Sequence, residues 1–200
     1  MTVYFHGSFG LNRKFMAGLL HDALTHPAKT STELAEPFGY KAPFANRYKS
    51  WLHKTGLIKP DSPIQLTQGG QIVYGQDPQL KSLVSIWFMH HALTADPENA
   101  EVWHWFDKEF LPQHSEFSKS GLEMGVANQL MPHDEKHFAI GSTMTRVIVR
   151  KLIDCYTSSE ALGGLGVVVA SNSGSFLRGN PKILGPWKTV PELRAAVSAE

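Results

Sequence analysis

Two histidines four positions apart, His133 and His137, enclose the acidic residues Asp134 and Glu135. On a helix this spacing would place both imidazoles on one side, where they could bind a single metal ion. The order departs from the H-E-x-x-H pattern because Glu135 comes one position late, and the preceding Pro132 favours a loop. A polar surface turn is therefore the alternative interpretation of this segment, which is still the best metal candidate in the sequence.

A second set of polar side chains occupies one face of a helix predicted from about Pro43 to Thr55. Asparagine can pair with adenine, arginine with guanine, and lysine with guanine or phosphate. Arginine and lysine near the start of an earlier helix could bind phosphates. The predicted DNA contacts are Arg13, Lys14, Lys41, Asn46, Arg47, Lys49, Ser50 and Lys54. A solvated helix face, or a winged helix that binds protein, is the alternative.

The elements that would position this face follow a recognisable order. Apolar residues recur at helical spacing from Leu11 to Thr25, and Thr30 and Glu33 form a capping box that opens a short helix. The basic helix ends at Gly56, and two short strands, 57–59 and 64–66, flank a Pro60–Pro63 turn. The sequence therefore predicts a winged helix-turn-helix domain over residues 1–75.

The remainder, residues 76–200, is predicted to be a helical domain that ends in a β-hairpin and a C-terminal helix. Helices are expected over 80–95, 97–110, 115–130 and 142–156, and Asn172-Ser173-Gly174 marks the hairpin turn. A second, degenerate winged unit around this hairpin is an open interpretation. The fold class is mainly α with small β-wings.

Composition limits the function classes. Apolar residues make up 42% and charged residues 18%, which is typical of a globular protein. The longest apolar run, 83–93, is too short to span a bilayer, and no signal peptide is recognisable, so a cytoplasmic protein without membrane association is expected. The single cysteine, Cys155, excludes an internal disulfide and is expected to be buried and inert.

Charge is distributed unevenly although the net charge is only +1. Residues 1–60 hold eight basic and three acidic residues, whereas residues 61–131 hold three basic and nine acidic ones. This asymmetry favours one surface for double-stranded DNA and another for protein partners or solvent.

Several segments in order resemble a known family. They are Phe5-His6-Gly7-Ser8-Phe9-Gly10-Leu11, Leu66-Thr67-x-x-Gly70, Asp77-Pro78, Trp87 to Leu93, Trp103 to Phe106, and Ser142 to Arg146 leading to Tyr156. This set resembles a bacterial domain-of-unknown-function family that includes SspB, the DNA-nicking component of phosphorothioate modification and phage-defence systems.

The resemblance implies a DNA-handling protein that works with sulfur-transfer and ATPase proteins of a modification or defence complex. A nickase would use a divalent metal, Mg²⁺ or Mn²⁺, to activate water. From residue chemistry, His6, Asp134 and Glu135 are the catalytic candidates, and His133 and His137 are the metal candidates. The alternative is a non-enzymatic transcriptional regulator or adaptor, and a homodimer is compatible with either function.

Overall fold

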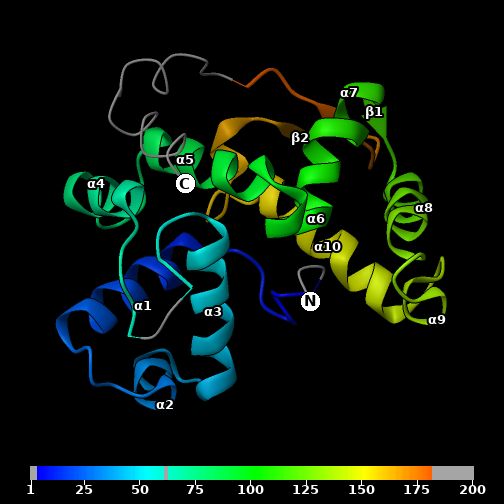
Figure 1. Cartoon of the computed structure of the whole chain (residues 1–200). Helices are drawn as coiled ribbons and strands as arrows, with labels where there is room; N and C mark the ends of the chain where they lie inside the picture. The colour runs from blue at the N-terminus through cyan, green and yellow to red at the C-terminus, as the bar shows by residue number, and fades with distance from the viewer. Residues whose placement is uncertain (1–3, 61–62, 182–200) are drawn as a thin grey trace. The chain divides into compact units, whose positions relative to one another are not determined.

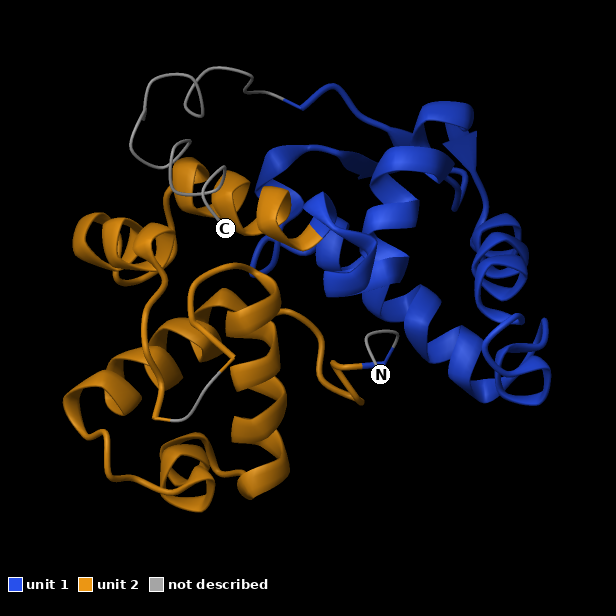
Figure 2. Cartoon of the chain, viewed as in Figure 1, with its two compact units in different colours: residues 1–4, 94–182 blue, residues 5–93, 183–200 orange. Residues whose placement is uncertain are grey.

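The structure, a computed structural model, describes residues 4–60 and 63–181 and is mainly helical with a small antiparallel sheet, which confirms the predicted fold class (Figure 1). Its described residues form two compact units, one of residues 5–60 and 63–93 and the other of residue 4 with residues 94–181 (Figure 2). We call them the helix-turn-helix unit and the sheet unit. The units divide after Leu93, while the domain boundary at residue 75 stays a prediction. The expected C-terminal helix lies outside the described residues.

The helix-turn-helix unit begins with the three helices that the sequence predicts. They are α1 (Arg13–Thr25), α2 (Ser31–Ala35), which continues into the 3₁₀ turn η1 (Glu36–Phe38), and α3 (Ala42–Lys54). Asn12 caps α1 through the N–H of Phe15, and the Thr30–Glu33 capping box opens α2. The apolar face of α3, with Phe44, Tyr48, Trp51 and Leu52, is buried. The capping and periodicity signals in the sequence therefore predicted these three helices correctly.

The wing of this unit is smaller than predicted. The segments 57–59 and 64–66 form one antiparallel bridge between Ile58 and Leu66, and the N–H of Lys59 donates to the carbonyl of Gln65 at 2.8 Å. The sequence did not predict α4 (Gln68–Gln76), which follows the bridge and precedes α5 (Leu83–Ala95). Glycines at 69, 70 and 75 masked the helical signal of α4.

The first segments of the sheet unit are α6 (Pro97–Trp105), the π-helical η2 (Phe106–Phe110), α7 (Leu111–Gln113) and β1 (Glu116–Phe117). The next are α8 (Lys119–Leu130), α9 (Glu135–Phe138), α10 (Thr143–Thr157) and η3 (Gly163–Leu165). The predicted hairpin is present as β2 (Val168–Ala170) and β3 (Phe176–Arg178).

The sheet has the order β1-β3-β2, with Phe117 opposite Phe176. The strand β1 was not expected, because its two residues were assigned to the start of the following helix. Pairing of β1 with β3 attaches the hairpin to the strand that precedes α8. In this unit β1 is followed by the helices α8, α9 and α10, by η3 and then by the β2–β3 hairpin, so a small wing-like hairpin follows a group of helices.

Within residues 4–60 and 63–181, no helix combines the length and the apolar character needed to cross a membrane.

Candidate nucleic-acid interface

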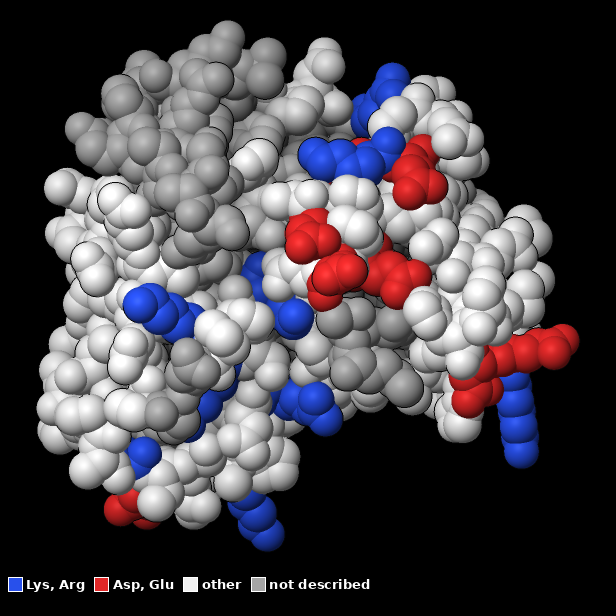
Figure 3. Space-filling view, viewed as in Figure 1, with Lys and Arg blue, Asp and Glu red and all other residues white. Residues whose placement is uncertain are grey.

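The two units carry opposite charge. Residues 5–93 contain nine lysines and arginines against five acidic residues, whereas residues 94–181 contain seven against eleven. Figure 3 shows blue side chains spread over the helix-turn-helix unit, while most red side chains in this view lie over the sheet unit. A polyanion would therefore be attracted to the helix-turn-helix unit.

Three of the predicted DNA contacts are exposed on this unit. Lys14 lies on the first turn of α1, Lys41 is the N-cap of α3, and Asn46 projects from the first half of α3. The first turns of the third helix supply most base contacts in helix-turn-helix proteins. Lys41 and Asn46 hold this position.

Other predicted contacts have structural partners. The Nζ of Lys49 donates to Ser31 Oγ at 3.2 Å and so joins α3 to the start of α2, and Ser50 Oγ donates to the carbonyl of Asn46 at 3.1 Å. Arg13 donates to the carbonyl of Leu80, a residue with φ of 53° in the turn before α5. Lys54 is half-buried near the end of α3. These residues support the interface, and Lys49 and Lys54 also add charge to it.

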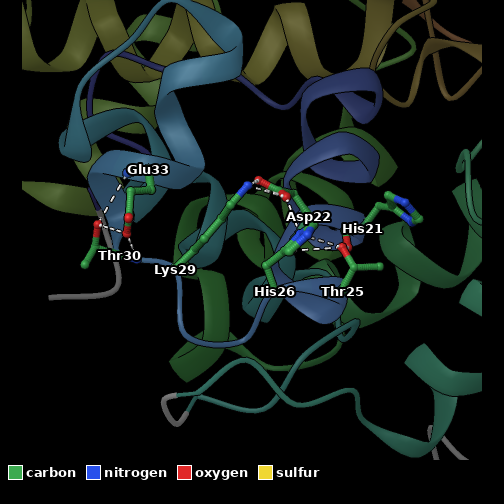
Figure 4. Close-up of polar contacts among 7 residues, drawn as sticks. All are labelled: His21, Asp22, Thr25, His26, Lys29, Thr30 and Glu33. Atoms are coloured by element: carbon green, nitrogen blue, oxygen red, sulfur yellow. Dashed lines mark hydrogen bonds and ion pairs between the residues drawn. The ribbon is translucent and has the colours of Figure 1, made fainter.

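The turn between α1 and α2 is held by an ionic cluster around Asp22 (Figure 4). Lys29 Nζ lies 2.7 Å from one carboxylate oxygen and His26 Nδ1 lies 2.9 Å from the same oxygen. The hydrogen bond from Lys29 is the main reason that the pKa of Asp22 is lowered. His21 points away from the cluster, and its Nδ1 lies 2.8 Å from Tyr74 Oη. The cluster fixes the direction in which the chain enters α2.

The aromatic and glycine-rich segment 5–10 is clamped onto α3. Arg47 Nη1 donates to the carbonyl of Phe5 at 3.0 Å, Tyr48 Oη to that of Gly10 at 3.0 Å, and Trp51 Nε1 to that of Phe9 at 3.1 Å. Gly7, with φ of +57°, lies so close to Arg47 that a Cβ would be 2.8 Å from Nε. The segment therefore holds α3 in place through Arg47, Tyr48 and Trp51, so Arg47 has a structural partner within the unit.

His6, a predicted catalytic residue, lies within this clamp. It is fully buried, its Nδ1 is 2.7 Å from the carbonyl of Gly7, and its ring stacks on Trp51 with centroids 6.2 Å apart. These contacts give His6 a packing role. Its catalytic role stays a prediction.

The His133–His137 segment belongs to the sheet unit and forms two separate pairs. His133 precedes α9, and its Nε2 lies 2.9 Å from Glu101 Oε2 on α6. Asp134 is the N-cap of α9, accepting from the N–H of His137 at 2.9 Å, and its other oxygen lies 2.7 Å from His137 Nδ1. Both bonds lower the pKa of Asp134, and the one from the backbone N–H of His137 has the larger effect. Glu135 is exposed.

The two histidines therefore do not share a helix, and each has its own carboxylate partner. Among residues 4–60 and 63–181, no group of three or more His, Cys, Asp or Glu side chains could hold a metal ion. The arrangement does not provide a three-ligand site, and the metal stays a prediction. Sequence reasoning missed Glu101, which lies 32 positions from His133 and carries no local signal.

Two hollows in the sheet unit were also not foreseen. A cavity of about 270 Å³ lies at the start of α10, and a groove of about 440 Å³ lies between the η2–α7 segment and α8. Tyr4, Lys136, His137, Ser142, Thr143, Met144 and Val147 line the cavity. The groove has Trp105 and Phe110 among its lining residues, and Gly125 lets Trp105 approach because a Cβ there would lie 2.8 Å from the indole.

Cys155 is buried, as expected, and burial raises the pKa of its thiol to about 12. A thiolate is the nucleophilic form of cysteine, so this side chain is unreactive at neutral pH.

The fold and the α3 face define a mainly helical protein with a helix-turn-helix unit. The model of the family described as "Protein of unknown function (DUF4007)" matches residues 44–166, which is more than half of the chain, and the chain belongs to this family. The match runs from α3 to the residue after η3, so it includes most of the sheet unit and the helix-turn-helix unit from α3 onward, while α1 and α2 lie outside it. No curated protein and no solved structure is significantly similar to the chain.

Proposed function

We propose that the chain is the DNA-binding component of a bacterial DNA-modification and phage-defence system. The observation that carries the proposal is the exposed start of α3, with Lys41 and Asn46, on a helix-turn-helix unit with an excess of basic residues. An α-helix fits the major groove of B-form DNA, where an asparagine amide can pair with adenine. Lys14 on α1 would hold a neighbouring phosphate.

Rigidity of α3 supports this proposal. The clamp on segment 5–10 holds one side of the helix, the Lys49–Ser31 bond joins it to α2, and the Asp22 cluster holds the turn between α1 and α2. A helix whose orientation is fixed before binding loses little conformational entropy when it meets DNA. The interface is therefore preorganised by contacts within its own unit.

The biological setting of the proposal comes from the ordered motifs that resemble the family of SspB. On that resemblance, the chain acts with sulfur-transfer and ATPase proteins in the cytoplasm and nicks DNA with a divalent metal. In the motif Thr67-x-x-Gly70, the hydroxyl of Thr67 accepts from the N–H of Gly70, which caps α4, and donates to the carbonyl of Gly56. A non-enzymatic regulator or adaptor is the competing function.

Binding to a short labelled DNA duplex tests the proposal. The affinity is measured between about 50 and 200 mM salt for the wild type and for the double variant Lys14→Ala/Lys41→Ala. Loss of two phosphate contacts should reduce the slope of log K against log salt by about 1.8. The matched control, Lys81→Ala/Lys108→Ala, removes two exposed lysines that lie outside helices α1 to α3 and should keep the wild-type slope. Wild-type protein that shows no salt-sensitive affinity for DNA refutes the proposal.

Supercoiled plasmid incubated with the protein and Mg²⁺ or Mn²⁺ separates the enzyme from the binder. Relaxed circles that disappear with EDTA support nicking, and variants His133→Ala and Glu135→Ala then test the candidate residues. A mobility shift without relaxed circles supports a regulator or adaptor and refutes nicking by this chain alone.

A further inference from the structure

The sheet unit contains a second helix in the position of a recognition helix. In this unit α8 and α10 pack together, α9 lies in the connection between them, and the β2–β3 hairpin follows (Figure 1). Pairing of β3 with β1 closes the small sheet that a wing requires. In the helix-turn-helix architecture the second helix of the pair enters the major groove. By topology, that helix is α10.

One face of α10 is buried and the opposite face is basic. Thr145, Ile148, Val149, Leu152, Cys155 and Tyr156 are buried in the unit. Arg146 and Arg150, four positions apart, are exposed on the other side, with Val147 beside them and Lys151 half-buried next to Arg150. The side chain of Arg146 is 65% exposed. This face can therefore reach a ligand without unfolding any part of the core.

The positive charge of this face is only partly neutralised. Arg146 Nε lies 3.8 Å from Glu123 Oε1 on α8, at the edge of an ion pair, and Asp154 lies one turn beyond Arg150. Burial and then the charge of Arg150 lower the pKa of Lys151, against a smaller opposing effect of Asp154. The face carries three cations on a unit that has an excess of acidic residues, so its charge is a local feature.

We propose that α10 is a second recognition helix, which enters the major groove of double-stranded DNA with Arg146, Val147 and Arg150 at the base edges. The inference rests on the proposed function for its ligand and adds a surface that the α3 interface does not include. Arginine binds the O6 and N7 atoms of guanine in a bidentate manner, and a small apolar side chain suits the methyl group of thymine. This combination favours duplex DNA over an acidic protein, because Arg146, Val147 and Arg150 lie within five positions on one helix and join bidentate donors to a small apolar side chain.

The hairpin of the same unit supplies groups that suit the DNA backbone. Its turn contains Ser171, Ser173 and Ser175, whose hydroxyls form a chain of hydrogen bonds, and Ser175 Oγ donates to Glu116. Short hydroxyl side chains and backbone N–H groups are common phosphate contacts. The β2–β3 turn thus resembles a wing that positions α10.

The test uses the full chain and a random-sequence pool of DNA duplexes, from which the wild type selects preferred sequences. Arg146→Ala and Arg150→Ala are each expected to lower the affinity for the selected duplex by roughly 5- to 150-fold and to relax the preference at one position. Arg146→Lys and Arg150→Lys keep the charge but lose bidentate geometry, so they should recover part of the affinity and little of the preference.

Lys108→Ala is the matched control, since it removes one exposed cation of the same unit that lies on η2 and not on α10. Far-UV circular dichroism of each variant should match that of the wild type. If the wild type binds DNA and the α10 variants keep its affinity and preference, this inference is wrong while the proposed function stands. If the wild type binds no duplex at all, both are wrong.

Discussion

Gly70 lies in the first turn of α4, directly against the backbone of Leu57 at the base of the wing. A Cβ at this position would be 1.9 Å from the carbonyl oxygen of Leu57, whereas ordinary van der Waals contact begins near 3.4 Å. The oxygen would have to move by about 1.5 Å, the difference between these distances. It accepts a hydrogen bond from the N–H of Thr67 at 3.2 Å, while the N–H of Leu57 donates to Leu52 at 2.9 Å. Movement would therefore disturb both bonds.

Gly70→Ala is expected to lower the free energy of unfolding by about 1–3 kcal/mol. Overpacking costs about 1–3 kcal/mol and a weakened hydrogen bond about 1 kcal/mol, while the better helix propensity of alanine returns about 1 kcal/mol. Gly75→Ala, in the same helix, is the matched control because no atom lies within 4 Å of its Cβ. It should raise the free energy of unfolding by about 0.4–1 kcal/mol.

Urea unfolding followed by circular dichroism measures both variants. With a slope of about 2 kcal/mol/M, the urea midpoint should fall by roughly 0.5–1.5 M for Gly70→Ala and rise slightly for Gly75→Ala. A Gly70→Ala midpoint equal to or above that of the wild type would refute the argument that α4 needs a glycine against Leu57.

Two further predictions concern the turn that positions α2. Because the folded-state pKa of Asp22 is depressed, its bond to Lys29 adds stability above the unfolded pKa of about 3.9 and loses it as the pH falls through the folded value. Asp22→Asn should therefore be less stable than the wild type by about 0.2–1 kcal/mol near neutral pH. In urea titrations at several pH values, this difference in stability should shrink below about pH 4. A difference that stays constant with pH would contradict the role of the ion pair. Thr30→Ala removes the cap of α2 and should lower the free energy of unfolding by about 1 kcal/mol in thermal unfolding. Thr32 is exposed within the same helix, so Thr32→Ala should lower it by less than half as much. Equal losses of stability in the two variants would argue against the cap.

The first three helices of the helix-turn-helix unit could be predicted because their signals are local. Asn12, Thr30 and Gly56 mark helix ends through bonds or dihedral angles within a few residues, and the apolar spacing of α3 determines its buried face. The wing and α4 were harder to predict, because a bridge of one residue pair is too short to leave a strand pattern and because glycine lowers helix propensity wherever it occurs. In α4, Gly69 and Gly70 are explained by close approach to Phe88 and to Leu57, which is a tertiary property.

The candidate site was likewise predicted only in part from the sequence. Residue types and periodicity predicted a polar face on α3, and Lys41 and Asn46 are exposed there. The sequence could not show that Arg47 holds the carbonyl of Phe5, or that Arg13 holds that of Leu80, since these partners lie 42 and 67 positions away. A basic side chain has several donors, and only the folded chain determines which acceptor comes within reach.

By itself, the sequence determined the mainly helical class, the order of the first three helices, the hairpin near residue 173 and the uneven charge, because each depends on neighbours along the chain. Tertiary structure alone decided that His133 pairs with Glu101, and that β1 joins β3 to complete the sheet beside α10. These contacts link residues that are distant in sequence. Their partners are selected by the packing of whole helices, and no local pattern encodes that packing.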